Sequence, residues 1–445
     1  ATAYLIGEVY LLSDAPSPRD SISFQIYQRI EERPPMIVYD TLSTMPSGDP
    51  EPGDYIQLAV STHAECGHEG SGGTNLDFSV DGNECDPLAN VYLYSGSPFI
   101  MRNNGDGDID LFYSIYSYGS GWNNTIQSYS SGPSPEYAET SSYRAFFSGR
   151  MGTDDNSIAV EQTTFAPTGG GDSANFMIQK LDIFSSDGNP HYSLAIGSLI
   201  DWDIPADYGA TNNAGISLKA RTVYFQGTDS SFTGCQDNSD RYGAEAFLGR
   251  YSSRDLTADS CDLNLNFHGA YAASNADELW LDDSLLATDL WNKTEARTGL
   301  NTYASNEDLF GAVTYAHGID LEPDDTLTFY TVLVSIREGT VQDLEHSVKT
   351  AIAWASDNLR PGCSFGCCQG IVGNVDCDPE DIVDISDLTC FIMRLFIDYD
   401  DPCFCCAEEA NADGDGDVII DIGDLTKLID YLFISYQPLP PCPQP

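Results

Sequence analysis

Two acidic segments near the C-terminus carry the residue types that bind a divalent cation. Each has oxygen-bearing side chains at alternate positions, followed by two more aspartates three residues apart. Oxygens on alternate residues of a tight loop can converge on one point, and Ca²⁺ prefers six to eight oxygen ligands at about 2.3 to 2.6 Å. The sequence therefore predicts two calcium sites, with ligands Asn374, Asp376, Asp378, Asp384 and Asp387 in the first, and Asn411, Asp413, Asp415, Asp421 and Asp424 in the second.

The two segments are copies of one another at an offset of 37 residues. Residues 383–389 read Val-Asp-Ile-Ser-Asp-Leu-Thr, and residues 420–426 read Ile-Asp-Ile-Gly-Asp-Leu-Thr. Apolar residues at helical spacing follow each copy, so each loop is expected to open a helix. A single Asp-rich turn forms for local backbone reasons. Two copies at one spacing, each opening a helix, indicate a metal-binding repeat instead.

This region, about residues 373–435, resembles the dockerin type I repeat, a paired calcium-loop and helix module that docks onto cohesin domains in bacterial assemblies. The Asp-x-x-Asp-Leu steps at 384–388 and 421–425 are the most specific part of the resemblance. Both loops are two residues longer than the family's, and Pro379 replaces the turn glycine that Gly416 keeps. The resemblance implies two bound Ca²⁺ ions and a cohesin-like scaffold as partner.

A third acidic segment leads into a predicted strand rather than a helix. Alternate oxygens there would suit a third calcium ion, and an Asp-Gly hairpin turn explains the same residues equally well. The pattern is compatible with either structure. The ligands of the third ion would be Asn104, Asp106, Asp108 and Asp110.

The thirteen cysteines indicate an oxidising compartment. No spacing typical of zinc sites is present, so disulfides in an exported protein are the better interpretation. Nine of the cysteines lie in residues 361–445, which hold 17 acidic residues against 2 basic ones. Cys66, with His63 and His68 nearby, fits either a metal cluster or a disulfide with Cys85, and the disulfide is favoured.

No catalytic motif is present: the sequence has no GxSxG elbow, no HExxH, no Walker loop and no dinucleotide-binding glycine pattern. Trp202, flanked by Asp201 and Asp203, is either a sugar-stacking platform or a core residue at a strand end. Among 69 acidic residues a glycosidase pair can always be chosen, so such a choice carries no information. We expect a protein that is not an enzyme.

Composition restricts the partners. The 445 residues include 19 Lys and Arg against 69 Asp and Glu, a net charge of −50, which argues against nucleic acid and anionic membrane surfaces. No apolar run approaches the roughly 18 to 20 residues that span a bilayer. Hydrophobic residues make up 41% of the chain, enough for a folded core.

Alternation of apolar and polar residues predicts the elements of the first 340 residues. The expected strands are residues 4–12, 21–27, 55–60, 91–94, 110–117, 141–149, 157–165, 174–184, 191–200, 221–226 and 326–336. One helix is expected at 340–358, where apolar residues recur at three- and four-residue steps. The predicted fold is mainly β, with one or two antiparallel β-sandwiches followed by a small α-helical dockerin-like calcium-binding domain.

The predicted domains follow these shifts of pattern and composition. An N-terminal β segment offers Tyr4–Leu12 as an assembly strand, because unpaired sheet edges accept added strands. The glycine-rich stretch at 168–171 is either a domain break or a long surface loop. The domains are a β segment at 1–62, a β-sandwich body at 63–360 closed by the helix 340–358, and a Cys-rich module at 361–445.

Together these features predict a secreted structural protein, the subunit of an extracellular or cell-surface filament. It would assemble through β-strand and calcium-stabilised dockerin-like contacts, with other copies of itself or a cohesin-like scaffold as partners. The alternative is a carbohydrate-active enzyme, or a polysaccharide-binding or adhesin protein, anchored to a scaffold through its tail and with glycans as partners. Neither hypothesis involves nucleic acid or membrane insertion.

Overall fold

The structure is a computed structural model. It describes residues 39–45, 55–62, 64–67, 77–78, 92–105, 107–117, 121–124, 126–128, 133–204, 212–217, 220, 222–228, 240–252, 268–274, 283–295, 300–301, 308–337, 339–359, 371–376, 382–397, 407–414 and 420–440. The predicted strands 4–12 and 21–27 lie outside these residues. No helix among the described residues is both long enough and apolar enough to span a membrane.

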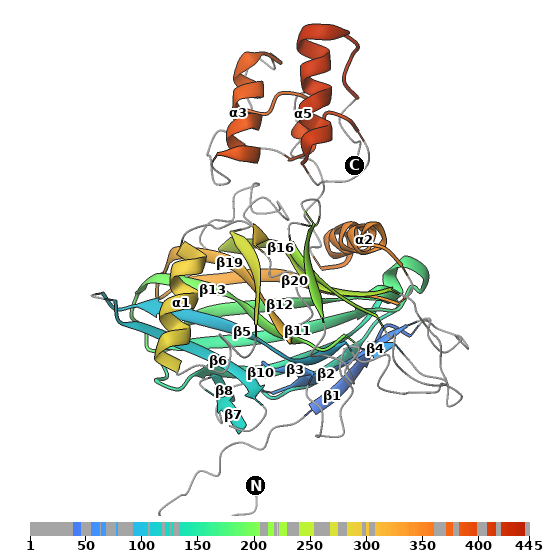
Figure 1. Cartoon of the computed structure of the whole chain (residues 1–445). Helices are drawn as coiled ribbons and strands as arrows, with labels where there is room; N and C mark the ends of the chain where they lie inside the picture. Colours follow the sequence, from blue (N-terminus) through green and yellow to red (C-terminus); the bar gives the residue numbers. More distant parts are fainter. Residues whose placement is uncertain are drawn as a thin grey trace, which may run out of the picture. The chain divides into compact units, whose positions relative to one another are not determined.

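Two β-sheets form the body of the protein and stack face to face (Figure 1). Among the described residues, one sheet has eleven strands and the other nine. Neighbouring strands run antiparallel, except for β17 and β18, which pair in parallel. The predicted mainly β fold with antiparallel sheets is confirmed.

The eleven-stranded sheet contains, in spatial order, β1 (Tyr39–Ser43), β2 (Ile56–Ser61), β3 (Cys66–Gly67), β5 (Leu93–Asn103), β13 (His191–Trp202), β19 (Leu309–Leu321), β17 (Gly269–Ser274) and β18 (Leu300–Asn301), with β4 (Asp77–Phe78) beside β2, β6 (Ile109–Ser117) beside β5 and β7 (Gly121–Asn124) beside β6. The nine-stranded sheet contains β14 (Asn213–Ser217), β15 (Thr222–Thr228), β16 (Asp240–Ser252), β20 (Thr326–Ile336), β12 (Phe176–Ser185), β11 (Ile158–Pro167), β10 (Tyr143–Thr153) and β8 (Ile126–Ser128), with β9 (Glu136–Glu139) beside β10.

The main core lies between the two sheets. Side chains of a strand alternate between its two faces, so Met177, Leu181 and Ile183 of β12 point into this core. Phe176 and Ile178 of the same strand point the other way, into a second apolar cluster. At β12, both faces of the nine-stranded sheet are therefore covered by apolar side chains.

The second cluster lies beneath α2 (Val341–Leu359), which packs on β20, β12 and β16. The predicted helix at 340–358 is thus confirmed. Its buried residues Leu344, Val348 and Ile352 follow the helical spacing on which the prediction rested. A helix that the sequence did not predict, α1 (Asp283–Glu295), covers part of the other sheet at β6 and β19.

The glycine-rich stretch at 168–171 is a loop within one sheet. β11 ends at Pro167, β12 begins at Phe176, and the two strands pair directly. A short 3₁₀ turn, η2 (Gly171–Asn175), connects them, and the positive φ of 70° at Gly170 suits a residue without a Cβ. No domain boundary lies here.

The N-terminal strands that the structure describes belong to the body. β1 pairs with β2, and β2 continues through β3 to β5 in the eleven-stranded sheet. The sheet of the body therefore begins before residue 62. Within the predicted segment 1–62, residues 1–38 and 46–54 lie outside the described part of the chain.

The C-terminal module has a core of its own. It contains α3 (Ile385–Phe396), the short α4 (Ala407–Ala410), α5 (Ile422–Ile429) and one π-helical turn, η6 (Asp430–Ile434). α3 and α5 pack together through a buried cluster that includes Phe391, Leu425 and Leu428. Each of these two helices follows one of the acidic loops, as the internal repeat predicts.

Candidate calcium-binding and docking module

Each acidic loop ends in a capping box that begins the next helix. In the first copy the Asp384 amide donates to Asp387 Oδ2 at 2.7 Å, and in the second the Asp421 amide donates to Asp424 Oδ2 at 3.0 Å. The side chains of Asp384 and Asp421 accept bonds from backbone amides of the first helical turn. A cap of this kind contributes about 1 kcal/mol to helix stability. The repeat in the sequence is therefore a repeat in local geometry.

The closing aspartates also tie each loop to its helix. Asp387 Oδ1 accepts hydrogen bonds from the amides of Val375, at 2.6 Å, and Asp376, at 3.2 Å. Asp424 Oδ1 accepts one from the amide of Asp413, also at 3.2 Å. Both closing side chains are buried. The sequence predicts them as calcium ligands, and the structure adds this structural role, which the Asp-x-x-Asp spacing alone does not reveal.

Burial makes ionisation of both closing carboxyl groups less favourable than it is in water. Burial raises the pKa of Asp387 to about 6 and that of Asp424 to about 7, although the backbone donors act in the opposite direction. The neighbouring carboxylate of Asp376 raises the first pKa further, and those of Asp413 and Asp421 raise the second. A bound cation would offset this cost of burying negative charge.

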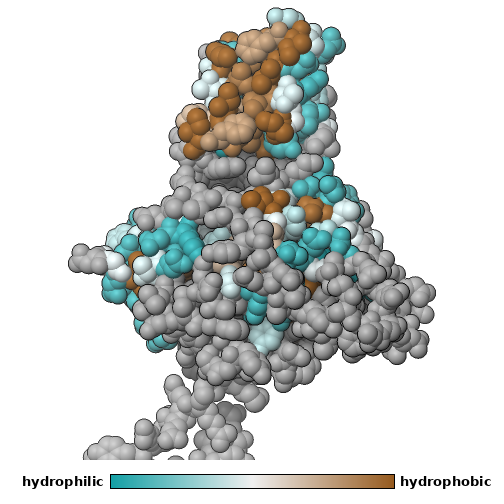
Figure 2. Space-filling view, viewed as in Figure 1, coloured by the Kyte–Doolittle hydropathy of each residue, from teal (hydrophilic) through white to brown (hydrophobic). Residues whose placement is uncertain are grey.

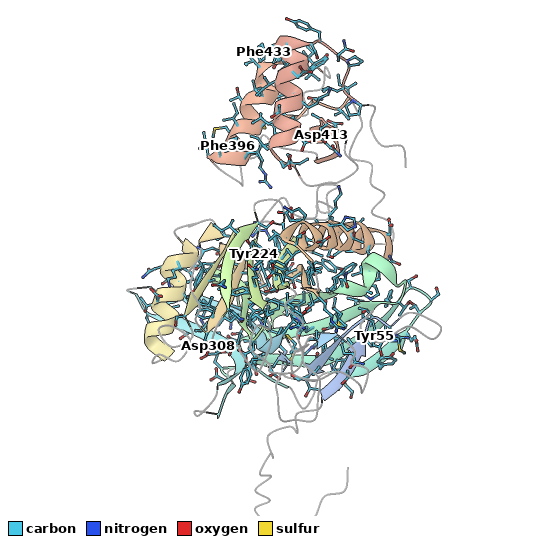
Figure 3. All side chains as sticks on the ribbon, turned by 45° about the vertical axis from the view of Figure 1, so that its right-hand side comes forward. Tyr55, Tyr224, Asp308, Phe396, Asp413 and Phe433 are labelled. Carbon is cyan, nitrogen blue, oxygen red and sulfur yellow. The ribbon has the colours of Figure 1, made fainter. Side chains whose placement is uncertain are left out.

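Two predicted ligands of the second site, Asp413 and Asp421, lie beside the first turn of α5. A Cβ placed on Gly423 would lie 2.7 Å from Asp413 Oδ2 and 2.9 Å from Asp421 Oδ1, so the two carboxylates are separated by little more than the space of one methyl group. Asn411 holds the loop by accepting a bond from the Gly414 amide at 2.9 Å. Figure 3 labels Asp413 on this loop. The oxygen-only donor set fits a hard cation such as Ca²⁺.

Of the other predicted ligands, two are buried asparagines and two lie outside the described residues. Asn374 is buried in the first loop and Asn411 in the second. Asp378 and Asp415 lie outside the described residues. The described acids of these loops do not form a group of three with oxygens within 4.8 Å of one another. The two calcium sites therefore remain a prediction.

The helices of the module expose a repeated apolar surface, which we call the paired face. It consists of Ile385, Phe396 and Ile397 from the first copy and Ile422, Phe433 and Ile434 from the second, each pair 37 residues apart. Phe396 and Phe433 are 60% and 55% exposed, and Ile397 and Ile434 are 66% and 69% exposed. Figure 2 shows hydrophobic residues gathered on this module, and Figure 3 labels both phenylalanines.

The third acidic segment is the turn of the β5–β6 hairpin. Gly105 and Gly107 adopt φ values of 91° and 80°, which favour glycine. The carboxylate of Asp110 is bound by Arg102, whose Nη2 lies 2.5 Å from Asp110 Oδ2. This ion pair competes with a cation for the same oxygen and favours the hairpin interpretation. Asp106 lies outside the described residues.

Two other sequence interpretations are decided by the core. Cys66 is a free, buried thiol, so the predicted Cys66–Cys85 disulfide is wrong. Strand β3 places this side chain in the core between the sheets, where it packs with apolar residues. His63 and His68 lie outside the described residues. Elsewhere, Cys390 of α3 is disulfide-bonded.

Trp202 is a core residue. It is 1% exposed and stacks on Phe225 with ring centroids 5.7 Å apart. The alternative of a sugar-stacking platform is therefore wrong for this residue. Its neighbours Asp201 and Asp203 instead form a group with Asp308, with carboxylate oxygens within 4.8 Å of one another. Sequence inspection misses this group because β13 and β19 meet only in the folded sheet.

No protein-family model matches the chain, and no curated protein is similar to it.

Proposed function

We propose that the chain is a non-catalytic structural protein that joins an extracellular assembly through its calcium-stabilised C-terminal module. The module docks through the paired face onto a cohesin-like scaffold domain, and the β body is the structural part of the subunit. A filament is the form of assembly that this organisation suits best.

The single observation that carries this proposal is the equivalence of the two halves of the paired face. Solvent-exposed apolar side chains cost solubility, and a contiguous exposed patch marks an interaction site. Here large apolar residues are exposed to nearly equal extents at matching positions of both copies. The small module core does not use these side chains. A repeated surface that packing leaves exposed is best explained by a partner.

Charge gives the partner's chemistry. Residues 361–445 hold 17 acidic residues and 2 basic ones, so the paired face lies in a strongly acidic module. A partner with an apolar strip bordered by basic residues would be complementary in both respects. The alternative of a glycan-active protein loses Trp202 as a candidate platform, because this side chain is buried.

The proposal is tested by titrating the full chain, with calcium, against a panel of cohesin domains in isothermal titration calorimetry. Saturable binding is expected. The double variant Phe396→Ser with Phe433→Ser should weaken it at least tenfold, because it removes two large exposed aromatic side chains, and aromatic residues buried at an interface often contribute more than about 1 kcal/mol each. Tyr192→Ser is the matched control, since Tyr192 of β13 is also an exposed aromatic, at 57%, but lies in the body.

Binding that survives the double variant would rule out the paired face as the docking surface. Calcium-dependent self-association that the double variant abolishes, without binding to any cohesin domain, would identify a second copy of the chain as the partner instead. The filament is tested separately by negative-stain microscopy of the purified protein with and without a chelator, and monomers in both conditions would contradict it.

A further inference from the structure

The last helical turn of the C-terminal module is followed by a tyrosine with a strained backbone. Ser435 caps the turn η6, and the next residue, Tyr436, adopts a φ of 55°. This left-handed region is unfavourable for a bulky side chain, and glycine is the usual residue at this position after a helix. The other described non-glycine residues with positive φ are Ala64, Asn156 and Ser193, none of which has a large side chain.

The fold explains the backbone conformation of Tyr436. Beyond this residue the chain returns to the module, where Leu439 packs on the apolar core and lies against Gly373 of the first loop. Pro440 lies against Gly414 of the second loop. A left-handed residue at 436 turns the chain back toward these contacts, and glycine would do so with less strain. Packing therefore requires the reversal of the chain, but it does not require a tyrosine there.

The side chain of Tyr436 contributes little to the module. It is 71% exposed, the highest value among the large hydrophobic side chains that the structure describes. It makes no hydrogen bond, ion pair or ring contact with another described residue. The turn is held without the ring, because the Ser435 amide donates to the Asp430 carbonyl at 2.8 Å and Ser435 Oγ donates to Asp430 Oδ2 at 2.5 Å.

The position of Tyr436 adjoins the paired face. The residue follows Ile434 by two positions, so their Cα atoms lie within about 7 Å of each other. The internal repeat also includes this tyrosine, since residues 396–399 and 433–436 both read Phe-Ile-x-Tyr. The first of these two tyrosines, Tyr399, lies outside the described residues.

We propose that Tyr436 is a docking residue that extends the paired face and holds an arginine or lysine of the partner against its ring. This inference rests on the proposed function, in which the partner has an apolar strip bordered by basic residues. A guanidinium or ammonium group is attracted to the negative face of an aromatic ring. The 17 acidic residues of segment 361–445, against 2 basic ones, attract the same cation.

The proposal separates stability from binding at a single residue. A residue that serves only the fold would suit its φ, whereas strain that persists at a binding residue is a cost of function. Tyr436→Gly and Tyr436→Ala remove the same ring, but only the glycine variant relieves the strain. The thermal transition of the module in the full chain should therefore be higher in Tyr436→Gly than in Tyr436→Ala, by about 4 °C for a domain of this size. Scanning calorimetry measures this difference.

Binding is measured by isothermal titration calorimetry of the full chain, with calcium, against the cohesin domains. Tyr436→Gly and Tyr436→Leu should each weaken binding at least about fivefold, because both lose the ring face. Tyr436→Phe keeps that face and should bind within about twofold of the parent chain. Tyr192→Leu is the matched control, since Tyr192 is an exposed aromatic residue of the body.

The outcomes distinguish this inference from the proposed function. Unchanged binding in Tyr436→Gly would remove Tyr436 from the docking surface, while the variant with both phenylalanines changed still tests the paired face. Equal losses in Tyr436→Phe and Tyr436→Leu would show that the hydroxyl group is recognised and overturn the contact between ring and cation. A glycine variant no more stable than the alanine variant would overturn the strain argument. A parent chain that binds none of the cohesin domains would overturn both proposals.

Discussion

Both regions of the molecule bury carboxyl groups, but they satisfy them in different ways. In the β body, Glu245 accepts hydrogen bonds from the hydroxyls of Ser198 and Tyr315, which come from strands of the opposite sheet. In the C-terminal module, Asp387 and Asp424 accept bonds from backbone amides of their own loops. The donors of the body are therefore distant in sequence, and those of the module are local.

This difference indicates what the stability of each region depends on. The body is held by an extensive apolar core between two sheets, and a buried acid such as Glu245 is a small perturbation of it. The module has a smaller apolar core, and the carboxyl groups of Asp387 and Asp424 are buried where each loop meets its helix. Its stability should therefore depend on how negative charge is compensated, whereas that of the body should depend on packing.

Removing calcium should produce the largest difference in stability between the module and the body. Each occupied site stabilises a folded state by about 4 kcal/mol when free Ca²⁺ exceeds its Kd a thousandfold. Scanning calorimetry of the full chain should show two transitions, and a chelator should lower that of the module while leaving that of the body unchanged. Asp387→Ala with Asp424→Ala should abolish the sensitivity. A chelator that moves neither transition would contradict the ligand assignment.

The buried carboxyl group of Glu245 should make the stability of the body depend on pH. Burial raises its pKa from 4.5 to about 7, so the folded state holds a proton that the unfolded state releases at lower pH. The stabilisation is fully present below pH 4.5 and is lost as the pH rises to about 7. The free energy of unfolding should therefore fall by about 3 kcal/mol over this range because of this group.

Denaturant unfolding of the body at pH 4.5 and 7 measures this effect, and Glu245→Gln should reduce the difference between the two values. The side chain Glu161, which forms a surface ion pair with Arg150, provides the matched control Glu161→Gln. An unchanged pH dependence in Glu245→Gln would show that the buried carboxyl group does not titrate in this range.

The smallest effect concerns the third acidic segment. Asp110→Ala removes one partially exposed ion pair with Arg102, which retains Asp155 at 2.8 Å, so the loss should be less than about 1 kcal/mol. Calcium should not change the thermal transition of the body in either protein. A calcium-dependent shift that Asp110→Ala abolishes would restore the alternative of a third metal site.

Much of the secondary structure was predictable because it depends on local pattern. The predicted strands that fall on described residues coincide with observed strands or their ends, and α2 begins where Thr340 and Asp343 form their bonds. The long strand β19 was missed for a physical reason. It is covered on both faces, so its first eight residues are all buried and show no alternation.

The features of the candidate site also differ in how far local sequence predicts them. The repeated loops and their closing acids were predictable, because ligands and caps of such a loop come from one short segment. The surroundings of Cys66 and Trp202 were not predictable, because they depend on which strands face each other. From the sequence, Cys66 was predicted to form a disulfide with Cys85 or to bind a metal, and Trp202 to be a sugar-stacking platform or a core residue. The structure excludes the disulfide, because Cys66 is a free thiol, and the platform, because Trp202 is buried.

The amino-acid sequence by itself determined the β-rich character of the body, the helix that covers it and the duplicated acidic module. These features arise from periodicity and short-range spacing. Only the tertiary structure decided the order of the strands, the burial of Cys66 and Trp202 between the sheets and the exposure of the paired face. The physical reason is that a buried contact between two sheets joins residues far apart in the chain, and no local pattern records which ones will meet.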